Sequence, residues 1–297
     1  MTITITGATG FVGQNLSKCL TEHGHTVVPL SMRKPGFTLD PGSEAVIHLA
    51  GKAHDTKNTA AEAEYFQINT ELTTKIFSQF LNSTAKDFIY FSSVKAAADA
   101  VAGILTEEIP ANPISPYGKS KKAAEDFLLA QNLPSGKRLI ILRPCMIHGP
   151  GNKGNLNLLY KLVQKGLPWP LAAYENQRSF LSIDNLNYVV ERILLSDIPS
   201  GIYNVADDIS ISTNELIKII AGITGRRAKL MHIPPRFMGT VAAVGDRLKL
   251  PLTSERLQKL TESYEVSNAK IKRELKINHL PLSVQHGLQI TIESFKG

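Results

Sequence analysis

Tyr117 and Lys121 stand four residues apart, in a stretch whose pattern predicts a helix over 116–131. Side chains at this spacing lie one turn apart on the same helix face, so the phenol and the ammonium can be neighbours. A phenol with its ordinary pKa of about 10 is a poor base at neutral pH, but a nearby positive charge favours its ionised form. The pair therefore predicts proton transfer to or from a hydroxyl group, unless both side chains lie on a solvated helix surface.

A second chemical signal lies at the start of the chain, where residues 7–13 read Gly-Ala-Thr-Gly-Phe-Val-Gly between a predicted strand and a predicted helix. Glycines there allow a tight turn, close approach of the backbone to a pyrophosphate, and close packing of helix on sheet. The positive end of the helix then faces the anion. We therefore expect a dinucleotide to contact Gly7, Thr9, Gly10, Phe11, Val12 and Gly13.

The elements that position these residues alternate between strand and helix patterns. Strands are predicted at 2–6, 26–30, 45–49, 88–91 and 139–143, and helices at 11–23, 63–82 and 116–131. This alternation predicts an α/β fold, a doubly wound parallel Rossmann sheet. Only about fourteen residues separate Leu30 from Ala45, so the usual helix and long loop around a third strand are abbreviated.

Beyond Pro144 the regular order is lost, and a smaller α-rich C-terminal substrate lobe is expected. We assign 1–146 and about 178–207 to the nucleotide-binding domain, and 147–177 and 208–297 to the substrate lobe. No flexible linker is evident, so the two parts should pack closely.

The glycine spacing and the sequence Tyr117-Gly118-Lys119-Ser120-Lys121 resemble the TGxxGxxG and YxxxK motifs of short-chain dehydrogenases/reductases. Arg143-Pro144, followed by His148-Gly149-Pro150-Gly151, is similar to a segment of the extended members, the NAD-dependent epimerase/dehydratase family. The resemblance covers nearly the whole chain. It implies a catalytic set of Ser93, Tyr117, Lys121 and Asn69, in which Tyr117 exchanges the proton of a sugar hydroxyl while hydride moves to or from nicotinamide.

The same resemblance implies cofactor contacts from Leu49, Ala50, Gly51 and Pro144, in addition to Tyr117 and Lys121. After the second strand, where an acidic residue would accept from the ribose 2′-hydroxyl, the chain has Arg33 and Lys34. These cations can pair with a 2′-phosphate, so we expect NADP, with NAD as the alternative.

Extended members of the family act on nucleoside-diphosphate sugars, which implies substrate contacts from Ser93, Lys95, Asn155, Arg178 and Arg256. Dehydratases carry an Asp-Glu pair where this chain has Val94-Lys95, which disfavours dehydration. The chain resembles most a subgroup acting on UDP-linked sugars in polysaccharide assembly. Reduction of a UDP-4-ketohexose at C4 is the favoured hypothesis, a 4-epimerase with retained NAD is the alternative, and a non-catalytic cofactor sensor is a remote one.

The bulk composition restricts the partners. The net charge of +7 comes from dispersed basic residues, which favours a phosphorylated small ligand over a nucleic acid. No apolar run approaches the length of a bilayer span, so we expect no membrane partner and a cytoplasmic location. Cys19 and Cys145 are expected to be buried thiols and no metal site is expected. A homodimer is expected by analogy with the family.

Overall fold

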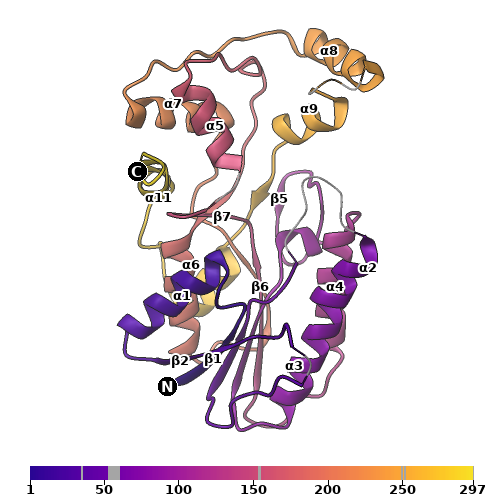
Figure 1. The fold of residues 1–297 in the computed structure, drawn as a ribbon, viewed down its shortest axis with the longest axis vertical. Helices are drawn as coiled ribbons and strands as arrows, with labels where there is room; N and C mark the ends of the chain where they lie inside the picture. Colours follow the sequence, from indigo (N-terminus) through magenta and orange to yellow (C-terminus); the bar gives the residue numbers. More distant parts are fainter. Residues whose placement is uncertain (35, 53–60, 153–154, 249, 251, 297) are drawn as a thin grey trace.

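The computed structural model describes residues 1–34, 36–52, 61–152, 155–248, 250 and 252–296, with the side chain of Asn155 outside this description. A six-stranded parallel sheet forms its centre, in the order β2-β1-β3-β4-β6-β9 (Figure 1). The strands are β1 Thr2–Thr6, β2 Thr26–Leu30, β3 Ala45–His48, β4 Asp87–Phe91, β6 Arg138–Pro144 and β9 Gly201–Val205. Helices cover both faces, so the predicted doubly wound α/β fold is confirmed.

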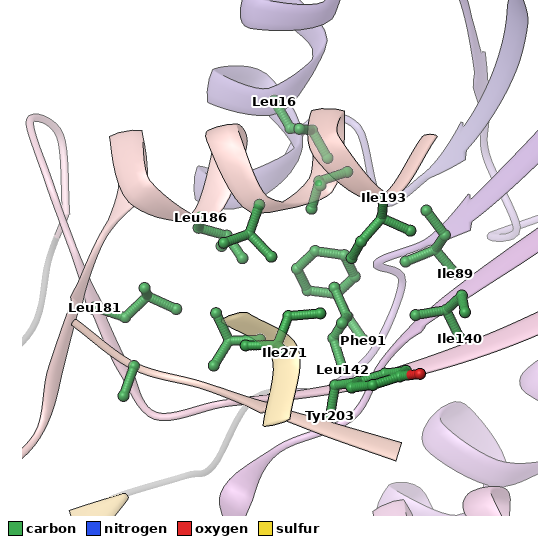
Figure 2. Packing of buried hydrophobic residues seen from close by; sticks show 14 of the residues in the cluster. Leu16, Ile89, Phe91, Ile140, Leu142, Leu181, Leu186, Ile193, Tyr203 and Ile271 are labelled. Carbon is green, nitrogen blue, oxygen red and sulfur yellow. The ribbon is translucent and has the colours of Figure 1, made fainter. Parts of the chain in front are cut away.

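Each face of the sheet has its own apolar cluster. The helices α1 Phe11–Glu22, α6 Ile183–Leu194 and α10 Ala269–Leu275 cover one face, and α3 Leu72–Leu81 and α4 Pro116–Leu129 cover the other. Figure 2 shows Leu16 and Ile193 above Ile89 of the sheet. On the opposite face the Phe77 ring meets the Phe88 ring edge-on, with centroids 4.9 Å apart. Burial on both faces explains why β4 is apolar without alternation.

The helix predicted over 63–82 is interrupted. It consists of α2 Glu62–Phe66, a π-helical stretch Gln67–Glu71, and then α3. A π-helical turn inserts extra backbone into a helix, and such turns are frequent at functional sites. Here the turn contains Asn69, whose side chain is fully buried.

The sheet ends at β2, and only a short connection follows Leu30. β2 pairs with β1, and the described residues between Leu30 and Ala45 form no further strand. The chain passes directly from β2 to β3, on the other side of β1. The C-terminal end of β2 therefore lies at an edge of the sheet.

Other elements build a third apolar cluster above the sheet. Its helices are α5 Asn155–Gln164, α7 Thr213–Thr224, α8 Pro235–Leu248, α9 Ser254–Thr261 and α11 Val284–Glu293. Short parallel pairs join β7 Met146–His148 to β8 Phe180–Ser182, and β5 Ile104–Leu105 to β10 Glu265–Val266. A 3-10 turn spans Val94–Ala96. Among the described residues, no helix combines the length and the apolar content that crossing a bilayer requires.

After α9, which belongs to the cluster above the sheet, the chain from β10 to α10 packs on the sheet again. Val266, Ile271 and Leu275 are buried in the same cluster as Leu16 and Ile193. We therefore propose a substrate lobe built around α5, α7, α8, α9 and α11, with β10 and α10 packed on the nucleotide-binding domain.

A buried ion pair fastens α4 to the sheet. Arg143 of β6 donates from Nε and Nη2 to the two carboxylate oxygens of Glu125, at 2.9 and 2.5 Å. Ser92, directly after β4, donates to the same carboxylate at 2.5 Å. Arg143 and Glu125 have side-chain exposures of only 3% and 0%. Removing one partner would leave an uncompensated charge in the interior.

Glu125→Ala should lower the free energy of unfolding by about 3–5 kcal/mol, because it leaves the Arg143 guanidinium buried without its counter-ion. Adding Arg143→Met should recover part of that loss. Asp126→Ala, which removes the exposed partner of Lys122 on the same helix, should cost less than about 1 kcal/mol. Urea unfolding of the variants tests this, and equal losses for Glu125→Ala and Asp126→Ala would contradict it.

Candidate functional site

The turn between β1 and α1 leaves room for backbone only. Gly7 has φ +69°, and a Cβ added there would lie 2.7 Å from the Ala50 amide nitrogen. A Cβ on Gly13 would lie 2.3 Å from the carbonyl oxygen of Gly7. The N-cap residue of α1, Gly10, makes no side-chain capping hydrogen bond. This cradle of amide groups fits the pyrophosphate of a dinucleotide.

His48, at the end of β3, ties this turn to the π-helical segment. Burial, followed by the charge of Lys121, lowers the pKa of His48 to about 3, so the imidazole is neutral. Thr73 donates to the Asn69 carbonyl at 2.7 Å and must therefore accept from His48 Nε2 at 2.9 Å.

The hydrogen-bonding role of the other ring nitrogen of His48 follows in the same way. His48 Nδ1 then accepts from the Thr6 hydroxyl at 2.6 Å. That hydroxyl accepts from the Ala50 amide at 3.1 Å. One neutral histidine thus positions the predicted cofactor segment Leu49, Ala50 and Gly51 relative to Asn69. The sequence motifs gave no sign of this function for His48.

Lys121 is buried, with 5% of its surface exposed, although lysine is rarely found in protein interiors. Its ammonium donates to the carbonyl oxygen of Phe91 at 2.8 Å and lies 4.9 Å from the centroid of the Tyr90 ring. Burial lowers the pKa of Lys121 to about 8, against an opposing contribution from Glu125 one turn further along α4. The ammonium is therefore poised to lose its proton just above neutral pH.

Asn69 and Lys121 meet at Gly51. A Cβ added to Gly51 would lie 3.0 Å from Asn69 Oδ1 and 3.2 Å from Lys121 Nζ. Asn69 Oδ1 accepts from the Lys52 amide at 2.7 Å, and Nδ2 donates to the Ser120 hydroxyl at 2.9 Å. Asn69 thus connects the segment after β3 with α4. Ser120 helps to position the Asn69 side chain.

Tyr117 and Ser93 are brought together by α4 and the end of β4. Burial raises the pKa of Tyr117, and a side-chain hydrogen bond with Ser93 lowers it in part. Tyr65 adds a smaller contribution that raises the pKa, and its ring lies edge-on to the Tyr117 ring at 6.2 Å. The sequence leads us to expect that Lys121 and an oxidised nicotinamide together favour the ionised phenol; in the protein alone, burial makes the largest contribution to this pKa. The phenol is therefore a proton donor at neutral pH.

Two of the predicted substrate cations, Lys95 and Arg178, lie near each other, and the third is on α9. Arg178 Nη1 donates to the Lys259 carbonyl of α9 at 3.1 Å, and Arg256 lies exposed on the same helix. Lys95 donates to the Asp99 carbonyl at 2.7 Å, and its ammonium lies 4.3 Å from the centroid of the Tyr264 ring. These contacts place Lys95 and Arg178 between the end of β4 and α9.

The charges of Lys95 and Arg178 also act on each other. The pKa of Lys95 is lowered, mainly by burial and further by Arg178, while Asp99 and Glu262 oppose the shift. The pKa of Arg178 is lowered by burial and raised by Glu262. An anion bound between the two cations would stabilise the charged form of both side chains. Asn155, predicted for the same place, begins α5, and its side chain lies outside the described part of the chain.

The remaining predicted residues lie on other elements. Arg33 and Lys34 are exposed just beyond the edge strand β2, and Thr9 is exposed in the glycine turn. Pro144 ends β6, opposite Val205 of β9. Within the described residues, no three metal-ligating side chains come together.

Lys121→Met should raise the free energy of unfolding at about pH 7 by about 1–2 kcal/mol, because it removes a buried charge whose pKa is lowered from 10.5 to about 8. The unfolded chain holds this proton more tightly than the folded chain. The wild type should therefore gain stability as the pH rises from about 8 toward 10.5, and the variant should lack that gain.

Urea unfolding at about pH 7 and about pH 9.5 measures both effects, with exposed Lys119→Met as the control on the same helix. A Lys121→Met variant that keeps the full pH dependence of the wild type would overturn the assignment.

Comparison with known proteins places this arrangement in a family. The NAD dependent epimerase/dehydratase family matches residues 3–42 and 37–206. A UDP-glucose 4-epimerase of Vibrio cholerae is 32% identical over 245 residues, 74% of this chain and 74% of the relative. A GDP-6-deoxy-D-mannose reductase of Pseudomonas aeruginosa is 28% identical over 256 residues, 78% of this chain and 83% of the relative.

A solved structure shares the fold over the whole chain. The UDP-glucuronic acid 4-epimerase of Bacillus cereus in complex with NAD superposes with a TM-score of 0.77, at 18% identity, and covers 100% of this chain and 99% of its own. The resemblance in the glycine turn and the Tyr117–Lys121 pair is therefore accompanied by similarity along most of the sequence and in the fold. The chain belongs to the NAD-dependent epimerase/dehydratase family.

Proposed function

We propose that this protein reduces a UDP-linked 4-ketohexose at C4 with NADPH, in the synthesis of a polysaccharide precursor. The observation that carries the choice of reduction is the end of β2, where exposed Arg33 and Lys34 stand in place of an acidic residue. Two cations there suit a 2′-phosphate. A preference for NADPH favours a reductase, because a reductase exchanges its cofactor after each turnover whereas an epimerase retains NAD.

The proposed chemistry uses the hydroxyl proton of Tyr117, whose pKa is raised by burial. When bound, the dinucleotide supplies the hydride that reaches C4 of the sugar. Tyr117 gives its hydroxyl proton to the carbonyl oxygen at C4, which becomes the new alcohol. Ser93, hydrogen-bonded to Tyr117, is placed to donate to the same oxygen. Asn69 holds the segment after Gly51 through the Lys52 amide and carbonyl, and Lys121 lies beside Gly51.

For the substrate, we propose that Arg178, Arg256 and Lys95 contact the diphosphate, with Asn155 at the start of α5. A guanidinium can donate two parallel hydrogen bonds to phosphate oxygens, which suits Arg178 at the base of α9. Dehydration has little support, because Val94 is buried and the ammonium of Lys95 is bonded to the Asp99 carbonyl. Neither residue supplies the extra carboxyl groups of an elimination.

A 4-epimerase with retained NAD is the second candidate, and the relative from Vibrio cholerae favours it, since that protein is named a UDP-glucose 4-epimerase. The same Ser93, Tyr117 and Lys121 would then act twice, first in oxidation at C4 and then in return of hydride to the opposite face. A cytoplasmic location, a homodimer, and the absence of nucleic-acid partners remain predictions.

The reductase proposal predicts stoichiometric oxidation of NADPH by a UDP-4-ketohexose, with slower oxidation of NADH. Tyr117→Phe should lower kcat by ~10²–10⁴-fold, since it removes the proton donor and keeps the ring. The loss of NADPH absorbance and mass spectrometry of the sugar product measure both.

Tyr65→Phe, which alters the neighbouring ring without removing the donor, is the matched control. Interconversion of UDP-glucose and UDP-galactose without added cofactor would establish the epimerase instead. Inactivity on all these sugars, with cofactor bound, would favour the non-catalytic sensor.

A further inference from the structure

Helix α8 carries an exposed apolar stripe. Phe237, Val241, Val244 and Leu248 follow one another at intervals of four, three and four residues, so they share one face of the helix. All four are exposed to solvent, from 36% for Val241 to 66% for Leu248. We call these four residues the α8 stripe. Solvated side chains of this size on successive turns of one helix mark an interaction surface.

A different face of α8 already packs against the protein. Met238, Ala242 and Gly245 are buried. Gly245 touches the backbone of Leu252, ahead of α9, so closely that a side chain has no room there. Because these residues hold the helix in place, the α8 stripe is left over after folding. Figure 1 shows α8 at an outer corner of the molecule, above α9.

The charges of α8 are distributed unevenly around the stripe. Arg236 and Arg247 are exposed and eleven residues apart, about three helical turns, so both lie along the same flank. The acidic residue of the helix, Asp246, faces α9, where its carboxylate accepts from the Ser254 amide at 3.0 Å and hydroxyl at 2.6 Å. The exposed side of α8 is therefore apolar with a cationic border.

We propose that α8 binds the surface of an anionic lipid bilayer, with the α8 stripe inserted at the level of the headgroups. An apolar face bordered by arginines is the pattern of helices that lie in the membrane interface. The long arginine side chains can reach the phosphates while the stripe enters the acyl boundary. The net charge of +7 of the chain adds long-range attraction. Such a helix needs no spanning length.

A second copy of the chain fits this surface less well. Antiparallel pairing of two α8 helices through the stripe would bring Arg236 and Arg247 of both copies to the same side of the interface. Like charges there repel, and Asp246 is turned away toward α9. An anionic surface instead neutralises all of these charges.

The test is sedimentation of the purified full-length protein with vesicles of phosphatidylcholine, alone or mixed equally with phosphatidylglycerol. The wild type should bind the anionic vesicles, and added salt should weaken the binding. Phe237→Ser combined with Leu248→Ser should lower the vesicle partition coefficient at least about tenfold, because two inserted side chains are lost.

Leu158→Ser combined with Leu195→Ser is the matched control. Leu158 and Leu195 are 66% and 62% exposed, close to the 66% of Leu248 and 60% of Phe237, but lie outside α8. This control should bind like the wild type. Arg236→Gln combined with Arg247→Gln should weaken the preference for anionic vesicles.

Two results would overturn the proposal. One is a failed sedimentation test: either the wild-type protein stays in the supernatant with both kinds of vesicle, or the α8 variants sediment as well as the control. The other is a concentration-dependent dimer, measured by light scattering without lipid, that the Phe237→Ser and Leu248→Ser changes abolish. That dimer would assign the α8 stripe to a second copy.

Discussion

The ammonium of Lys121 lies inside the protein, with the carbonyl oxygen of Phe91 as hydrogen-bond acceptor and the Tyr90 ring beside it. A charge at such a position is unfavourable unless polar groups surround it. Much of the site can be understood as the set of features that make this burial tolerable. Glu125, one turn along α4, opposes the loss of its proton, and Arg143 holds Glu125 in place.

The same charge fixes the character of its neighbours. It helps keep His48 neutral, and the neutral imidazole can then connect Thr6 with Thr73. It also requires a small residue at Gly51, where a side chain would press on Lys121 and Asn69. The π-helical turn brings Asn69 to that point. The cofactor turn, the segment after β3 and the start of α4 are thereby held in one arrangement.

How far the sequence predicts this arrangement depends on the range of the interactions. The parallel sheet, the glycine turn and the Tyr117–Lys121 spacing follow from local periodicity and sterics. The neutral state of His48 and the Arg143–Glu125 pair arise from contacts between residues distant in sequence, which periodicity cannot provide. The contribution of burial to the pKa of Tyr117 likewise does not follow from spacing, which does not give the depth of burial. The π-helical turn was missed because the apolar pattern of 63–82 fits an uninterrupted helix.

The substrate lobe illustrates the same limit. Its helices were expected from composition, but the return of β10 and α10 to the sheet depends on tertiary packing. Because the sequence has no long apolar run, we expected no membrane partner. The length of apolar runs detects segments that span a bilayer, but not helices that lie on its surface. Whether an apolar face of a helix is exposed can be decided only when the packing of the other helix faces is known.

The central claim, that a buried and strained charge at Lys121 organises the site, can be tested by nuclear magnetic resonance. Proteins labelled with ¹⁵N at lysine side chains would be titrated, with the Lys121 signal assigned by its absence from Lys121→Met. The structure predicts that Lys121 loses its proton with a pKa of about 8, below the ordinary value of 10.5. Titration at the ordinary lysine pKa would show a solvated ammonium and contradict this account.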